Sequence, residues 1–161
     1  MVKLSGFADE ISQDLNEQLD TLESLGIKYL EFRGVWNKNV LDLTAEELGE
    51  VKAEIDRRGI GVSAIGSPIG KAPVDADFDE YKVLVQHAID VAKVMESPNI
   101  RMFSFYVNDL DRDRDEVMRR LAASGLLDAN ARLPFPALPL RVGVAWPCCV
   151  WPRWVSCTAT S

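Results

Sequence analysis

The chain has 161 residues, of which 47% are hydrophobic and 27% are charged, and this is the composition of one soluble globular domain with a sizeable core. Its formal net charge of −7 predicts no nucleic-acid partner, because a protein that binds a phosphate backbone needs clustered lysine and arginine. Neither a secretory signal nor an apolar run of membrane-spanning length is found, so we expect a cytoplasmic protein with no membrane partner.

Two strand–helix units are predicted at the start of the chain. Residues 3–8 favour a short strand, and residues 27–36 favour a second one. The helix between them has four leucines on one face, Leu15, Leu19, Leu22 and Leu25. Asp14 and Glu17 have the spacing of a capping box, which predicts that this helix starts at Asp14. Thr44 and Glu47 have the spacing of a capping box, in which each side chain binds the other residue's backbone N–H. This spacing predicts that the second helix starts there.

Two further units follow. Residues 60–65 predict the third strand, and the apolar spacing that follows predicts a helix over about 78–95. Residues 99–106 are apolar on both sides, as in a parallel strand covered on both faces. A fourth helix is expected to start near Asp113 and to end before Gly125.

Strict alternation of strands and helices predicts an α/β fold with a parallel sheet and right-handed crossovers. Binding sites in such sheets gather at the carboxyl ends of the strands. An open doubly wound sheet and a (β/α)8 barrel both begin with this pattern. A complete barrel needs about 250 residues, so four units correspond to about half of one.

The composition changes after residue 125. Residues 1–125 carry 15 basic and 24 acidic residues, whereas residues 126–161 carry three arginines and one aspartate. The second segment also holds five of the eight prolines, three of the four tryptophans and all three cysteines. We therefore expect an irregular tail over 126–161, in which only residues 142–146 could pair as a short strand.

A charged pair marks the end of the second strand. Glu31 and Arg33 lie two residues apart, so their side chains project to the same face just before Gly34. They could bind a polyol and an anion, or they could form a structural ion pair. Trp36 follows, and it could stack on a sugar ring or cap the core.

The loop Gly66–Lys71 resembles a phosphate-binding loop. It fails the P-loop spacing, because three residues separate Gly66 from Gly70, and Ala72 occupies the position of the serine or threonine that binds magnesium. Lys71 could still attract an anionic substrate group, or it could be a solvated lysine in a flexible loop.

Other candidate residues point away from several kinds of site. His87 is the only histidine and is predicted on a solvated flank of the third helix, which excludes a histidine-rich metal site and a Ser-His-Asp triad. Asp9 and Glu10 follow the first strand, where they could serve a site or start a helix.

Four stretches, in this order, resemble the sugar phosphate isomerase/epimerase family, which has the xylose-isomerase-like TIM-barrel fold. They are Gly6-Phe-Ala-Asp-Glu-Ile11, Tyr29-Leu-Glu-Phe-Arg-Gly-Val-Trp36, Gly66-Ser-Pro-Ile-Gly-Lys71 and Arg101-Met-Phe-Ser-Phe-Tyr106. The resemblance covers residues 1 to about 124 and the first half of the family's barrel. It implies an incomplete (β/α)8 barrel over 1–125, with the tail over 126–161 outside it.

The family's chemistry, as the resemblance implies it, is proton transfer next to a sugar carbonyl with a divalent metal ion such as Mn²⁺ or Mg²⁺. The family's metal ligands lie on the later strands. We therefore expect no metal site in this chain and leave its catalytic residues unassigned. The matching motifs imply that a sugar or sugar phosphate is bound by four residues, Glu31, Arg33, Trp36 and Lys71.

The first interpretation is thus a truncated isomerase or epimerase that is inactive alone. A non-enzymatic half-barrel, which associates with another copy or chain through the exposed edges of its first and fourth strands, is the alternative. An endonuclease-IV-like protein is disfavoured, because those enzymes use histidine-rich metal sites. The compositional change after about Ser124 also suggests a frameshift, which translation of the other two reading frames would test.

Overall fold

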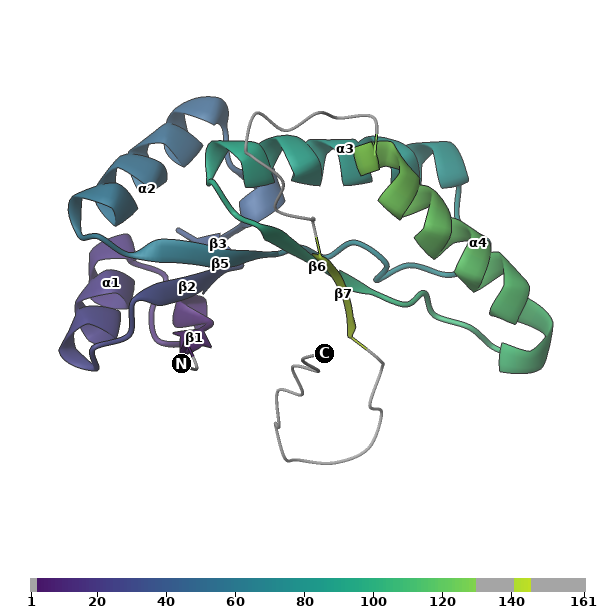
Figure 1. Ribbon diagram of the computed structural model, residues 1–161, viewed down its shortest axis with the longest axis horizontal. Coiled ribbons are helices and arrows are strands. Elements are labelled where there is room, and N and C mark those ends of the chain that lie inside the picture. Colours follow the sequence, from purple (N-terminus) through teal and green to yellow (C-terminus); the bar gives the residue numbers. More distant parts are fainter. Residues whose placement is uncertain (1–2, 130–140, 146–161) are drawn as a thin grey trace.

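The computed structural model describes residues 3–129 and 141–145. A five-stranded parallel sheet runs in the order β1-β2-β5-β6-β7 (Figure 1). Its strands are Ser5–Gly6, Tyr29–Phe32, Gly61–Gly66, Asn99–Phe103 and Arg141–Ala145. The α-helices α1 to α4 are Leu15–Ser24, Ala45–Arg57, Phe78–Val94 and Leu110–Ala129. A two-residue turn joins the antiparallel hairpin of β3 (Gly34–Val35) and β4 (Lys38–Asn39). Short 3-10 helices cover Ala8–Glu10 and Val40–Asp42.

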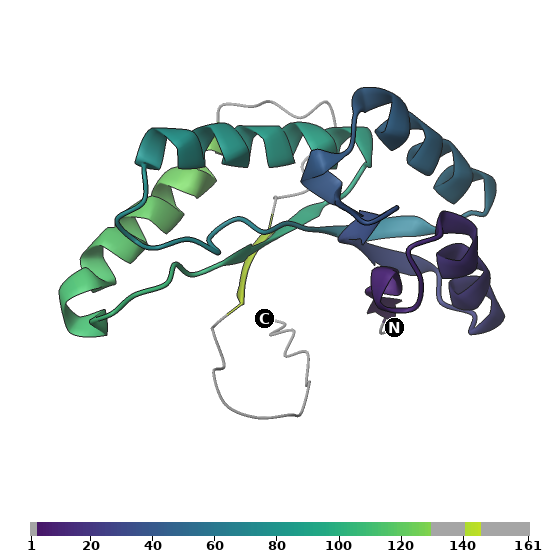
Figure 2. The ribbon, with the colours of Figure 1, turned by 180° about the vertical axis from the view of Figure 1, so that it is seen from behind.

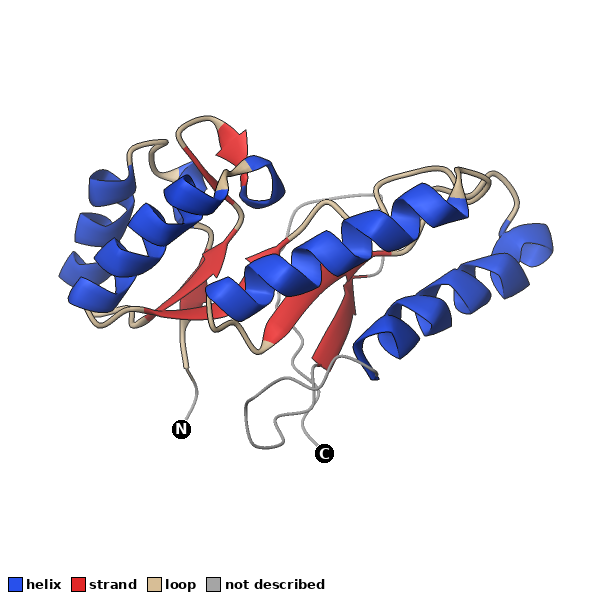
Figure 3. Ribbon diagram, turned by 90° about the horizontal axis from the view of Figure 1, so that it is seen from above, coloured by secondary structure: helices blue, strands red, loops and turns tan. Residues whose placement is uncertain are grey.

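The strand order distinguishes the two folds that the sequence left open. Each strand of the described sheet lies beside the one that precedes it in the chain, and α2 and α3 cover the same face (Figures 1 and 3). A doubly wound sheet reverses its strand order and carries helices on both faces. The fold is therefore the first part of a barrel, as the resemblance implied.

Alternation along the strands separates a core face from an inner face. Leu30 and Phe32 of β2 are 1% and 0% exposed and belong to the main hydrophobic core. The helices contribute their apolar stripes to this core, including Leu19, Val51, Ile55, Val85 and Ile89. The intervening residues occupy the opposite face, because successive side chains of a strand point to opposite sides. We call this opposite face, which carries Glu31, Ala64 and Arg101, the inner face.

The expected helix starts are confirmed for α1 and α2. Asp14 accepts hydrogen bonds from the backbone N–H groups of Asn16 and Glu17. Thr44 and Glu47 form the capping box, since the Thr44 hydroxyl accepts from the Glu47 N–H and the Glu47 carboxylate accepts from the Thr44 N–H. Local hydrogen bonding thus fixes where these helices start.

The fourth helix differs from its predicted bounds at both ends. It starts at Leu110, because the Asp109 carboxylate, rather than that of Asp113, accepts from the N–H groups of Asp111 and Arg112. It also continues past Gly125 to Ala129. A single glycine costs a helix only about 1 kcal/mol, which neighbouring residues can offset.

Strand β7 lies within the segment that we expected to be irregular. It pairs in parallel with β6, from Asn99 beside Arg141 to Phe103 beside Ala145 (Figure 2). The sequence indicated a short strand at nearly this position. The expectation that the fourth strand is a free edge is therefore wrong, because β7 covers β6 and the edges of the described sheet are β1 and β7. Residues 126–129 also belong to α4 and are not irregular, and the remainder of the segment lies outside the described residues.

An ion-pair network joins α1 to α2. Arg58, at the end of α2, pairs with Asp20 and Glu23 of α1 and with Glu54 of its own helix. Hydrogen bonds from Arg57 and Arg58 lower the pKa of Glu54 to about 2. The folded state therefore favours the ionised carboxylate.

We predict that acid weakens the fold through Glu54. Its stabilising contribution is complete above the ordinary pKa of 4.5 and is lost as the pH falls toward 2. Urea unfolding at pH 5 and pH 3 should show a smaller loss of stability for Glu54→Gln than for the parent chain. Glu50→Gln, an exposed change in the same helix, is the control and should retain the parent's loss. Equal losses for the parent and Glu54→Gln would contradict the prediction.

Candidate functional site

Three strands bring charged and aromatic side chains together at their carboxyl ends. Phe7 and Asp9 follow β1, Glu31 and Arg33 lie at the end of β2, and Arg101 and Phe103 lie on β6. We call these six residues the mouth cluster. Parallel strands end at the same edge of a sheet, so residues that are distant in sequence meet there.

Arg33 is held by the residues that follow β1. Its Nε lies 2.6 Å from Asp9 Oδ2, and its Nη2 lies 3.1 Å from Glu10 Oε1. Its guanidinium carbon is 4.9 Å from the centroid of the Phe7 ring. The ion pair considered between Glu31 and Arg33 is therefore replaced by pairs from Arg33 to two other carboxylates. Asp9 and Glu10 therefore contact Arg33, and both also lie in the 3-10 helix Ala8–Glu10.

Arg101 lies between two aromatic rings and faces Glu31. Its guanidinium carbon is 4.8 Å from the Phe7 centroid and 4.9 Å from the Phe103 centroid. Its Nε lies 3.6 Å from Glu31 Oε1, too far for a hydrogen bond, and is buried without a partner. Burial lowers the pKa of Arg101. Burial also raises the pKa of Glu31, against the lowering effects of Arg101 and Arg33.

We predict that Glu31 titrates above its ordinary pKa of 4.5. Replacing Arg101 by glutamine removes a nearby positive charge and should raise that pKa further. The shift can be measured by following the Glu31 side-chain carbon in a ¹³C NMR titration. A midpoint at or below 4.5 in the parent chain would contradict the prediction, and Arg119→Gln, an exposed change on α4, is the control.

Trp36 packs against the core, and it does not line the polar cavity of about 370 Å³ that is described below. Trp36 and Asn37 form the turn of the β3–β4 hairpin, with φ angles of 54° and 58°. Such left-handed pairs match the twist of two-residue hairpins but are unusual for a bulky residue. Gln13 holds the turn, because its carbonyl accepts from the Trp36 N–H and its side-chain oxygen accepts from the Asn37 N–H. Trp36 is partly buried against the core, as the capping alternative requires, and its role in sugar binding stays a prediction.

The loop Gly66–Lys71 is pinned to β6. The buried Ser67 hydroxyl donates to the Arg101 carbonyl at 2.6 Å, and the Phe103 N–H donates to the Ile69 carbonyl at 2.8 Å. Lys71 is exposed, and its Nζ lies 4.6 Å from the Phe103 centroid. The loop thus carries Lys71 to the mouth cluster.

His87 is exposed on α3, and its Nε2 lies 2.9 Å from the Leu41 carbonyl, so it takes no part in the site.

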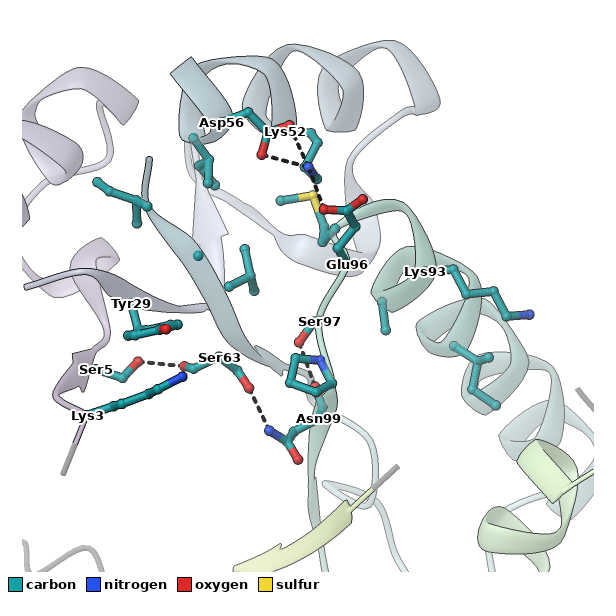
Figure 4. Close-up of a pocket in the computed structure, with 18 residues that line it drawn as sticks. Lys3, Ser5, Tyr29, Lys52, Asp56, Ser63, Lys93, Glu96, Ser97 and Asn99 are labelled. Atoms are coloured by element: carbon teal, nitrogen blue, oxygen red, sulfur yellow. Dashed lines mark hydrogen bonds and ion pairs between the residues drawn. The ribbon is translucent and has the colours of Figure 1, made fainter. Parts of the chain in front are cut away.

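A polar cavity of about 370 Å³ opens beside the mouth cluster. Its lining residues are Asp9, Gln13, Arg33, Gly34, Asn37, Lys38 and Asn39. A larger cavity of about 500 Å³ lies at the opposite, amino-terminal ends of the strands (Figure 4). Its walls include Ile55, Ile89 and Met95, and its charged Lys52 is paired with Asp56 and Glu96. The smaller cavity is the candidate site, because barrel active sites occur at the carboxyl ends.

The mouth cluster does not fit a metal ion. Among the described residues, no group of three or more histidine, cysteine, aspartate or glutamate side chains is placed to hold one. Asp9 and Glu31 face arginines, which compete with any cation for their carboxylates. The described helices also include none that is long and apolar enough to cross a membrane.

Sequence reasoning proposed four site residues, Glu31, Arg33, Trp36 and Lys71, but gave no role to Arg101. The signal was present, because Arg101 and Phe103 are two residues apart near the end of a strand, like Glu31 and Arg33. The apolar character of residues 99–106 hid it and predicted burial on both sides. In the structure Ile100 and Met102 are buried, while Arg101 and Phe103 are partly exposed.

No protein-family model and no curated protein matches the chain. Solved structures do match it. A sugar phosphate isomerase/epimerase from Parabacteroides distasonis has a TM-score of 0.66 at 15% identity, over 98% of this chain and 60% of that one. A probable 3-DHS dehydratase from Bacillus anthracis has a TM-score of 0.66 at 15% identity, over 82% and 50%. A 3-keto-D-glucoside 4-epimerase from E. coli has a TM-score of 0.57 at 14% identity, over 89% and 54%.

These matches establish the fold. The chain spans about half the length of the solved structures that it matches. Its neighbours are xylose-isomerase-like TIM-barrel proteins, so the parallel sheet and four helices correspond to part of such a barrel.

Proposed function

We propose that this chain is the N-terminal half of a sugar phosphate isomerase/epimerase barrel, that its mouth cluster binds a sugar or sugar phosphate, and that the chain alone does not turn it over. The four motifs and the fold support the family. The inactivity follows from the chemistry, because the family's proton transfer uses a divalent ion. The later strands, where the family's metal ligands lie, fall outside the units that are matched here.

One observation carries the binding proposal. Three buried side-chain polar atoms of the described residues lack a hydrogen-bond partner, and two of them, Asp9 Oδ1 and Arg101 Nε, belong to the mouth cluster. One is an acceptor and the other is a donor, whereas buried polar groups are nearly always paired. A polyhydroxylated ligand can satisfy both, because each hydroxyl donates and accepts.

An NMR titration of the isotope-labelled chain with D-fructose 6-phosphate tests this proposal. Amide resonances of the mouth cluster should shift on addition of the sugar phosphate, and they should shift less in Arg101→Gln than in the control Arg119→Gln. Incubation in D₂O with Mg²⁺ or Mn²⁺ should introduce no carbon-bound deuterium into the sugar, as measured by mass spectrometry. Absence of mouth shifts would refute binding, and rapid deuterium incorporation would refute inactivity.

A half-barrel assembly module is the second candidate. Strand β1 is an edge of the described sheet and is only two residues long, and the neighbouring Leu4 is 69% exposed. Unpaired edges tend to bind other strands. Light scattering after size-exclusion chromatography separates the two candidates, because a clean monomer that binds sugar argues against assembly.

We also propose, from composition alone, that the tail after about Ser124 arose by a frameshift, and we see no support for an endonuclease-like site.

A further inference from the structure

We propose that Arg101 and Lys71 form a subsite, across the ring of Phe103, for the carboxylate group of a polyhydroxylated acid. This inference rests on the proposed sugar-binding function and specifies the class of ligand. Three observations carry it. Two cations contact the Phe103 ring, only one of them faces a described carboxylate, and the backbone N–H groups of the loop Gly66–Lys71 suit a phosphate poorly.

Two cations contact the Phe103 ring, and one of them has no carboxylate partner among the described residues. Lys71 Nζ is 4.6 Å and the Arg101 guanidinium carbon is 4.9 Å from its centroid. Arg101 faces Glu31 at 3.6 Å, whereas Lys71 forms no ion pair within the described residues. Arg33, beside them, already faces two carboxylates, those of Asp9 and Glu10. Lys71 is therefore the one cation of this group that faces no described carboxylate, and a monoanion would offset its charge.

Arg101 also presents an incomplete set of hydrogen bonds. Its Nε is buried without a partner, and the flanking rings of Phe7 and Phe103 fix the plane of the guanidinium. A planar guanidinium edge matches the two oxygens of a carboxylate. Because this Nε has almost no accessible surface, a ligand oxygen would accept from its N–H only after the neighbouring side chains shift.

The adjacent loop is poorly suited to a phosphate. Phosphate sites typically offer several free backbone N–H groups. In Gly66–Lys71 the Ser67 N–H donates to the Ile65 carbonyl, the Ile69 N–H to the Ser67 hydroxyl, and the Lys71 N–H to the Pro68 carbonyl. Pro68 has no N–H. A phosphate monoester also carries a charge of about −1.5 to −2 at neutral pH, which exceeds the single charge of Lys71.

Four probes distinguish the possibilities: D-gluconate, the neutral polyol D-glucitol, D-fructose 6-phosphate and inorganic phosphate. We expect D-gluconate to bind most tightly and to shift the Arg101 side-chain Nε–H resonance. Arg101→Gln should weaken D-gluconate binding by about tenfold or more, because the variant loses a hydrogen bond between charged groups. Lys71→Gln should weaken it by about threefold, because Lys71 is exposed. D-glucitol binding should be unchanged in Lys71→Gln.

The outcomes separate this inference from the proposed function. If D-fructose 6-phosphate or inorganic phosphate binds more tightly than D-gluconate and depends on Arg101 and Lys71, the subsite takes phosphate and the carboxylate assignment fails. If D-glucitol binds as tightly as D-gluconate, there is no anion subsite, although polyol binding stands. If no probe binds at the mouth cluster, both proposals fail. Lys71→Gln keeps the test valid if Arg101→Gln does not fold, because it changes only an exposed side chain.

Discussion

Replacing Gly70 by alanine is expected to destabilise the folded chain by about 3 kcal/mol or more, from left-handed backbone strain and overpacking together. Gly70 has a φ angle of 84°, and a Cβ built on it would lie 1.8 Å from the Phe103 carbonyl oxygen. Relief would require moving β6 away from the loop. The free energy of unfolding, measured with urea, should fall accordingly.

Gly49→Ala is the matched control for Gly70→Ala. Gly49 lies inside α2, its φ is not in the left-handed region, and an added Cβ would meet no heavy atom within 4 Å. The same substitution should therefore stabilise the chain there, by about 0.5–1 kcal/mol, because alanine has the better helix propensity. A Gly70→Ala chain within 1 kcal/mol of the parent would show that the loop does not need its close approach to β6.

Replacing Phe32 by alanine is expected to cost about 3–5 kcal/mol, a large share of the roughly 5–15 kcal/mol that stabilises a typical domain. Phe32 is 0% exposed and is the last residue of β2, between Glu31 and Arg33 in the chain. The cavity that Phe32→Ala leaves in the core should therefore loosen β2, which positions Glu31 and Arg33. Thermal and urea unfolding measure the first effect, and weaker binding of the probe sugars at the mouth cluster measures the second.

Val83→Ala is the control for Phe32→Ala. Val83 lies on α3 and is 71% exposed, so its truncation should change the free energy of unfolding by less than about 0.5 kcal/mol. If Phe32→Ala were equally mild, the packing of β2 against the helices would not be what holds the mouth cluster in place.

Local patterns predicted most of the elements. Each helix is marked by an apolar stripe, and α1 and α2 also start at the predicted polar caps, because these signals act within a few residues. The β3–β4 hairpin was missed, since Trp36 and Asn37 adopt left-handed conformations that their residue types do not favour and that Gln13 stabilises from another element. The strand order, which separates a barrel from a doubly wound sheet, depends on long-range packing.

The candidate site was predicted as single residues but not as pairs. The alternation of β2 places Glu31 and Arg33 on one face, and the structure agrees. Their partners come from β6 and from the segment after β1, so no spacing within β2 could identify Arg101 or Asp9. The resemblance pointed to the carboxyl ends of the strands, because its motifs lie at the ends of successive strands.

The order β1-β2-β5-β6-β7 has a consequence for how the chain folds during synthesis. Every strand of this described sheet after β1 pairs with a strand that has been synthesised before it. Translation proceeds at about 5–20 residues per second, so each strand is available before the next one emerges. Strand pairing can therefore follow the order of translation, one strand–helix unit at a time, with each new unit covering the edge left by the last.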